Sequence, residues 1–166
     1  MGCDIHTYVE YGKKDEEGKI RWRNFGGRVN PGRNYFLFGT LCKGVRSDLE
    51  HGFSQRGLPE DMAYASKNDS RLFISEHEGD GNCTLERAMT WESHGCKITN
   101  NEFAEPVFVE HPDWHSHSWL SYEEFDKALA LYYEKAELKF KEPEYEALLA
   151  SMKKFIELGF ECRIVF

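Results

Sequence analysis

Residues 120–140, LSYEEFDKALALYYEKAELKF, decide the fold class because they contain the clearest helix of the chain. Ser121 and Glu124 have the spacing of a capping box, and Leu120 can pack on Phe125 across that cap. Apolar side chains then recur every three or four residues, the period of one helix face. The predicted apolar face comprises Phe125, Leu129, Tyr132, Tyr133, Ala136 and Phe140. We therefore predict a helix that packs on a core.

A second helix and a closing strand follow this helix. The second helix is predicted to begin at Pro143, because proline fits the first helical turn, and to end at Gly159, a residue typical of helix C-termini. Its predicted buried face comprises Tyr145, Leu148, Leu149, Met152 and Ile156. Residues 160–166, FECRIVF, have the composition of a β-strand and close the chain.

The N-terminal residues predict a β-hairpin. Residues 3–11, CDIHTYVEY, alternate between two faces, with Ile5 and Val9 on the inner face. A charged turn over 12–19, GKKDEEGK, leads to a returning strand over 20–25, IRWRNF. This hairpin supplies the first two strands of the predicted sheet.

A loop and a short helix come next. Residues 26–33, GGRVNPGR, contain the glycines and proline of a loop. Residues 34–45, NYFLFGTLCKGV, have apolar residues at helical spacing, and Asn34 is a typical N-cap residue. We expect this helix to contribute to the core.

The middle of the chain carries weaker signals. Residues 46–105 are predicted to be mostly irregular, with one or two helical turns over 57–66 and short strands over 97–100 and 106–111. The predicted class is α+β: one domain over 1–166, with a small mixed or antiparallel sheet and two C-terminal helices packed on it.

The composition of the chain indicates its expected cellular location and limits the kinds of partner it can bind. The chain has 166 residues and a net charge of −8, with ten Lys or Arg against eight Asp or Glu in the first sixty residues and four against eleven in the next sixty. An acidic protein is a poor nonspecific partner for nucleic acid. The five cysteines form no CxxC pair, and no apolar run approaches membrane length. We expect a cytoplasmic protein with reduced cysteines and no membrane association.

Two pairs of polar residues predict a metal site. Asp4 and His6 share one face of the first strand, and His115 and His117 share a face if that segment is extended. Carboxylate and imidazole ligands with room for water suit a catalytic Zn, Mn or Fe ion. The alternative is that these histidines are ordinary hydrogen-bonded residues at a strand edge and a helix entrance.

Several residues predict the binding of a small anion. His115 precedes a helix start, whose amides attract anions, and Ser116 and Ser118 add hydroxyl donors. A phosphate there would let His6 or His115 act as general acid or base even without a metal. Three arginines in the least acidic part of the chain are candidate substrate contacts, although each can equally be paired with a neighbouring acid: Arg33, Arg46 and Arg56.

Five blocks of the sequence resemble a known family. These blocks are MGCDIHTYVE, RNYFLFGTLCKGVR, RGLPEDMA, HSHSWLS and CRIVF, and they are spread over the chain except for residues 67–109. The combination resembles an uncharacterised family of small bacteriophage and bacterial proteins that begin MGCDIH, for which no function is known. The resemblance implies no chemistry but selects the following residues for attention: Asp4, His6, Arg33, Asn34, Arg46, Arg56, Asp61, His115 and Ser118.

Two specific functions are consistent with these observations, and so is a structural or assembly protein without a pocket. The first is a metal-dependent hydrolase or phosphoesterase for a small, nucleotide-like anion, with Asp4, His6 and His115 as catalytic residues and His117 as a further metal ligand. Substrate contacts would come from Arg33, Asn34, Arg46, Arg56, Ser116 and Ser118. The alternative is a phage-type binding or inhibitor protein that sequesters a nucleotide or blocks a host protein through its acidic surface, without catalysis.

Overall fold

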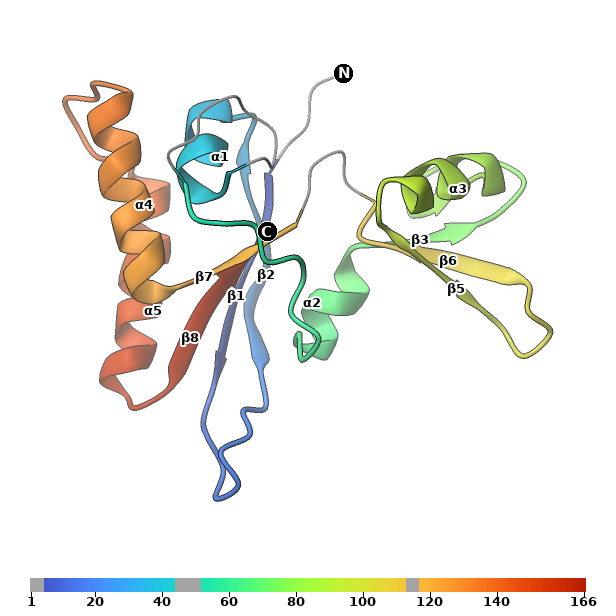
Figure 1. Cartoon of the computed structure of the whole chain (residues 1–166), viewed down its shortest axis with the longest axis horizontal. Coiled ribbons are helices and arrows are strands. Elements are labelled where there is room, and N and C mark those ends of the chain that lie inside the picture. Colours follow the sequence, from blue (N-terminus) through green and yellow to red (C-terminus); the bar gives the residue numbers. More distant parts are fainter. Residues whose placement is uncertain (1–4, 44–51, 113–116) are drawn as a thin grey trace. The chain divides into compact units, whose positions relative to one another are not determined.

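The structure is a computed structural model that describes residues 5–43, 52–112 and 117–166 (Figure 1). The chain divides into two compact units. We call residues 1–63 with 115–166 the terminal unit, because it combines both ends of the chain, and residues 64–114 the inserted unit. The α+β class predicted from the sequence is confirmed, whereas the assignment of one domain stays a prediction.

The terminal unit is built on a four-stranded antiparallel sheet with the order β2-β1-β8-β7. Its strands are β1 (Ile5–Gly12), β2 (Arg23–Gly32), β7 (Trp119–Ser121) and β8 (Glu161–Val165). The predicted hairpin and closing strand are confirmed. The segment predicted as a loop over 26–33 instead continues β2 as far as Gly32. The first and last strands of the chain are therefore neighbours in the sheet.

The described residues of the terminal unit also form three helices, and the starts of these helices follow the sequence signals. They are α1 (Tyr35–Leu41), α4 (Tyr122–Lys135) and α5 (Pro143–Glu157). Asn34 caps α1, and both bonds of the predicted capping box are present at the start of α4. The backbone at Gly159 has a φ of 81°, a conformation that glycine adopts without strain, and this ends α5.

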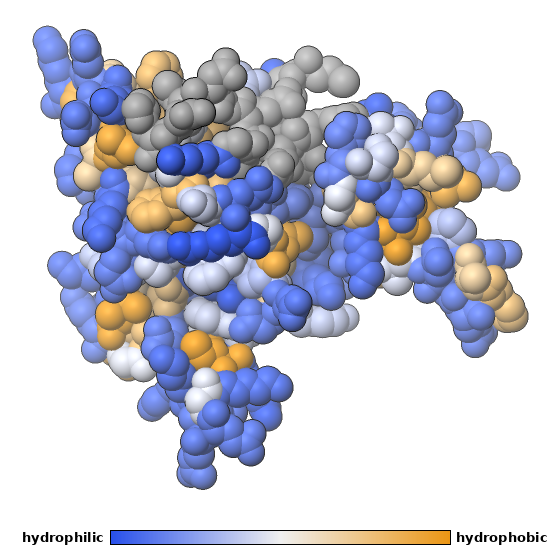
Figure 2. Space-filling view, in the orientation of Figure 1, coloured by the Kyte–Doolittle hydropathy of each residue, from blue (hydrophilic) through white to orange (hydrophobic). Residues whose placement is uncertain are grey.

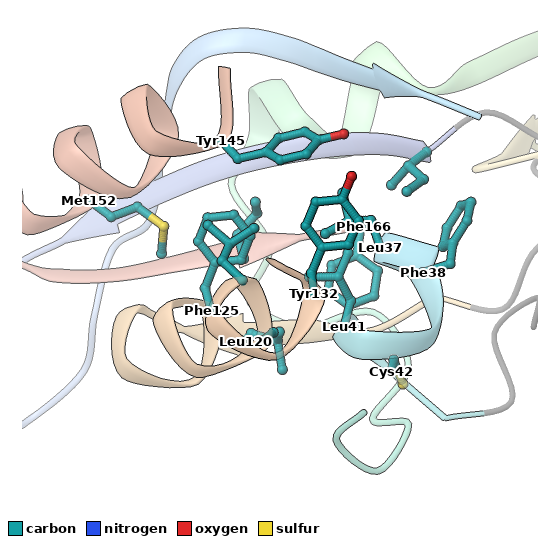
Figure 3. Close-up of a cluster of buried hydrophobic side chains, with 14 of the residues drawn as sticks. Leu37, Phe38, Leu41, Cys42, Leu120, Phe125, Tyr132, Tyr145, Met152 and Phe166 are labelled. Carbon is teal, nitrogen blue, oxygen red and sulfur yellow. The ribbon is translucent and has the colours of Figure 1, made fainter. Parts of the chain in front are cut away.

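The main core lies between one face of the sheet and these helices, and Figure 3 shows the side chains that α1, α4 and α5 contribute to it. Phe125, Leu120 and Met152 are essentially inaccessible to solvent, as predicted. The predicted faces of the two long helices are wrong at their ends. Phe140 lies beyond the last residue of α4 and is 68% exposed, and Ile156 in the last turn of α5 is 36% exposed.

The inserted unit has a second sheet with the order β4-β3-β6-β5. Its elements are α2 (Tyr64–Asp69), β3 (Arg71–Ile74), β4 (Asn82–Cys83), α3 (Leu85–Ser93), β5 (Lys97–Asn100) and β6 (Pro106–Glu110). Helix α3 packs its Ala88 and Trp91 on Cys83 and Val109 to form a small core. The predicted strands at 97–100 and 106–111 are confirmed. The rest of this region is more ordered than the sequence predicted.

No helix among the described residues has the length and apolar character needed to cross a bilayer.

Candidate functional site

The face of the terminal sheet opposite the helices carries the candidate site. In β1, Val9 and Tyr11 pack towards the helices, so the alternating pleat turns His6, Tyr8 and Glu10 to the opposite face. The register pairs Tyr8 with Val165 of β8, and Val165 with Trp119 of β7. These three residues therefore form one row across three strands of that face.

On the same face, the next row beyond Val165, at the C-terminal end of β8, would contain His6 and His117. Each of them lies two residues before a member of the previous row, so each shares that row's face. Ser118 and Phe166 exchange two backbone hydrogen bonds of 2.8 and 3.0 Å, which continue the strand pairing to this end. His6 and His117 consequently flank the end of β8. Two strand spacings put their Cα atoms roughly 10 Å apart.

Both histidines are partly buried, and each makes interactions within the protein. Four other predicted members of the site lie outside the described residues: Asp4, His115, Ser116 and Arg46. Within the described ranges there is no group of three or more His, Cys, Asp or Glu residues arranged to hold a metal ion. The register thus brings two predicted ligands to one level of one sheet face.

Arg56 and Ser118, two predicted substrate contacts, contact each other. The fully buried Ser118 accepts a hydrogen bond from the backbone N–H of Arg56 at 3.1 Å. The Arg56 guanidinium forms two hydrogen bonds to the Glu124 carboxylate, one of 2.7 Å from Nη1, and lies 4.6 Å from the ring centre of Trp119. This pairing raises the pKa of Arg56 and lowers that of Glu124. The charge of Arg56 is therefore balanced within the protein.

Asn34 joins α1 to the two C-terminal helices. Its Oδ1 accepts from the backbone N–H of Leu37 at 3.0 Å, and its Nδ2 donates to the hydroxyls of Tyr132 at 2.9 Å and Tyr145 at 3.1 Å. Figure 3 shows these two hydroxyls directed to the same side. The Tyr132 hydroxyl donates to Glu142 at 2.6 Å, and burial together with this carboxylate raises its pKa. Both polar atoms of the Asn34 side chain thus form hydrogen bonds within the protein.

Sequence reasoning missed a buried ion pair on the same face as His6. Arg163 of β8 lies opposite Glu10 of β1, and its Nε donates to Glu10 Oε2 at 2.9 Å. The other Glu10 oxygen accepts the backbone N–H of Ala63 at 2.8 Å. Neither side chain is accessible to solvent by more than 6%. The available signal was a charged residue flanked by apolar residues in each strand, Glu10 between Val9 and Tyr11 and Arg163 between Cys162 and Ile164.

Asp61 and Trp22 complete this ion-pair cluster. Asp61 Oδ1 accepts from Arg163 Nη1 at 2.8 Å, and its Oδ2 accepts from the Trp22 indole at 2.8 Å. The Trp22 ring lies 3.9 Å from the guanidinium carbon of Arg163. Burial raises the pKa of Asp61, but these hydrogen bonds outweigh it, so the net pKa is lowered. The cluster fixes residues 61–63 on the sheet face that carries His6.

Comparison of the chain with protein-family models, with curated proteins and with solved structures gives no match. The resemblance to proteins that begin MGCDIH therefore stays a prediction.

Proposed function

We propose that this protein binds one divalent transition-metal ion, Zn, Mn or Fe, at the end of the terminal sheet and uses it to hydrolyse a small, nucleotide-like anion. The proposal is supported by the strand register, whose continuation beyond Tyr8 and Trp119 would put His6 and His117 on one face and at one level. Asp4 and His115, their neighbours in sequence, are the candidates for the remaining ligands.

The ligand chemistry favours hydrolysis over a purely structural metal. Imidazole nitrogen binds Zn, Mn or Fe at about 2 Å, so two ring nitrogens on one ion are at most about 4 Å apart. The two histidines must therefore lean towards each other across the end of β8. A metal ion held by imidazole and carboxylate ligands that leave a coordination position for water lowers the pKa of that water enough to produce hydroxide near neutral pH.

An anionic substrate is supported by the position of Arg33. Gly32 is the β2 partner of Ile5, so the exposed Arg33 follows at the same end of the sheet as His6. A guanidinium can bind phosphate through two parallel hydrogen bonds. We assign Arg33 to the substrate because it is exposed at this end of the sheet.

The test measures metal content and hydrolysis in the same preparations. The full-length protein is loaded in turn with Zn, Mn and Fe(II), freed of excess ion, and analysed by mass spectrometry of the elements. We expect close to one equivalent in wild type, at least a tenfold loss of affinity in His6→Ala and in His117→Ala, and no change in His77→Ala, an exposed histidine of the inserted unit. Hydrolysis of phosphate mono- and diesters should follow the metal content.

Metal binding that survives in both His6→Ala and His117→Ala would contradict the proposal, as would a wild type that retains no ion. The alternative, a binding protein without catalysis, is supported by the acidity of residues 64–114, which carry ten Asp or Glu against four Lys or Arg. That function predicts a partner complex unaffected by chelators and by His6→Ala.

A further inference from the structure

A separate pocket lies between the β1–β2 hairpin and the turn that joins α5 to β8, which are adjacent in Figure 1. Its volume is about 390 Å³, which falls within the range of small-molecule sites. It is lined by Tyr11, Gly12, Lys13, Asp15, Arg21, Arg23 and Phe160. Three of these seven residues are cationic and two are aromatic.

The three cations lie together because of the hairpin register. Tyr11 pairs with Arg23, and the next contact along the hairpin, Lys14 with Ile20, keeps the same register. Lys13 and Arg21 lie between these two contacts, one on each side of the hairpin, and because both line the pocket their like charges repel each other. The tip of this hairpin is hydrophilic in Figure 2. A bound anion would remove this repulsion.

No described residue supplies a counter-ion to these three side chains. Lys14, the neighbour of Lys13, is by contrast paired with Glu161 at 3.0 Å. Asp15 also lines the pocket, but its Oδ1 accepts the backbone N–H groups of Glu17 and Lys19 and thereby closes the hairpin turn. The lining residues thus carry three positive charges and one negative charge, so the pocket is net cationic on a protein that is acidic as a whole.

The aromatic wall of the pocket is held in place by other rings. Tyr11 stacks on Phe155 of α5, with ring centres 4.1 Å apart and planes inclined by 11°. Phe160 meets Tyr11 edge-on at 5.6 Å. Phe25 of β2 supports Phe155 from the side at 5.1 Å. Because these contacts fix Tyr11 and Phe160, the wall can contact a flat ring without first being ordered.

We propose that this pocket binds a small ligand that joins a phosphate group to an aromatic ring, with the dimensions of a nucleoside monophosphate. Lys13, Arg21 and Arg23 would bind the phosphate, and Tyr11 and Phe160 would contact the base. The pocket lies about six residues along β1 from His6, which is roughly 20 Å in a strand. It is therefore distinct from the proposed metal site and does not depend on it.

The test is calorimetric titration of the full-length protein with AMP, GMP, CMP and UMP. The comparison ligands are ribose 5-phosphate, adenosine and inorganic phosphate, which each lack part of the proposed chemistry. We expect saturable binding of at least one nucleotide, with at least tenfold weaker binding of all three comparison ligands.

Variants locate the binding site. Arg21→Gln combined with Arg23→Gln should weaken nucleotide binding at least tenfold, and Lys13→Gln provides a second, milder change. Lys14→Gln is the matched control, because it removes a cation of the same hairpin whose charge is paired outside the pocket. His77→Ala, an exposed position of the inserted unit, should bind nucleotide like wild type. Circular dichroism checks that each variant is folded.

Three results would overturn the proposal. The first is the absence of saturable binding of every nucleotide at millimolar concentration. The second is binding of inorganic phosphate as tight as that of the nucleotides, which would show that the aromatic ring contributes nothing to binding. The third is unchanged nucleotide binding in both the folded double variant and Lys13→Gln.

Discussion

Replacing Glu10 by alanine should destabilise the terminal unit strongly, because Glu10 is the buried partner of Arg163. The change removes two contacts to the guanidinium, at 2.9 Å from Nε and 2.8 Å from Nη2, and the acceptor of the Ala63 N–H. Removing one partner of a buried ion pair typically costs about 3–5 kcal/mol. Asp61 still binds Arg163 in the variant, so we expect the lower end, about 3 kcal/mol.

Asp61→Asn provides a matched comparison on the same arginine. The Asp61 side chain is 58% exposed, whereas that of Glu10 is inaccessible. Water can form the hydrogen bonds that an exposed carboxylate loses. Asp61→Asn should therefore lower the free energy of unfolding by about 1 kcal/mol or less. The double variant Glu10→Leu with Arg163→Met should be more stable than Glu10→Ala, because no isolated charge remains buried.

Urea unfolding at pH 7, followed by far-UV circular dichroism and tryptophan fluorescence, measures these differences as changes in the free energy of unfolding. The expected order of stability is wild type, then Asp61→Asn, then the double variant, then Glu10→Ala. If Glu10→Ala lies within 1 kcal/mol of wild type, or if Asp61→Asn costs as much as Glu10→Ala, the reasoning from burial is refuted.

Three further predictions concern α4 and the cysteines. Ser121→Ala should lower the free energy of unfolding by about 1 kcal/mol in urea, since it removes the N-cap bond of α4; no loss would show that the cap is dispensable. The hydrogen bond from Arg56 lowers the pKa of Glu124 below its unfolded value, so its stabilisation is complete above the unfolded pKa and is lost as pH falls through the folded pKa. Thermal unfolding between pH 2 and 7 should therefore depend less on pH in Glu124→Gln than in wild type, and equal dependence would contradict this pairing. Burial raises the pKa of Cys162 to about 12, so iodoacetamide at pH 8 should modify the partly exposed Cys96 well before Cys162 in the native protein, as peptide mapping would report; equal rates would contradict the burial.

Local signals predicted the helices of the terminal unit well. Each of these signals involves residues within one helical turn, so it can be recognised from the sequence alone. They are the capping box at Ser121 and Glu124, the N-cap at Asn34 and the proline at position 143. The strands of the inserted unit are two to five residues long. Of these strands β5 and β6 were predicted, whereas β3 and β4, with four and two residues, are at or below the shortest length that gives a periodicity signal, and the region around them was predicted to be irregular.

Long-range pairing explains what the sequence did not predict. Glu10 and Arg163 are 153 residues apart, and Arg56 and Glu124 are 68 apart, so no local pattern connects them. The shared face of Asp4 and His6 is a prediction from strand periodicity alone, and Asp4 lies outside the described residues. That His117 reaches the same level as His6 depends on the register of β7 and β8, which only the structure supplies.

X-ray absorption at the zinc edge of the zinc-loaded protein tests the proposed metal site most directly, because it reports which atoms surround the ion. We predict at least two imidazole nitrogens at 2.0–2.1 Å in wild type and a loss of imidazole scattering in His117→Ala. A first shell of oxygen alone, or a spectrum that is the same in wild type and His117→Ala, would contradict the account.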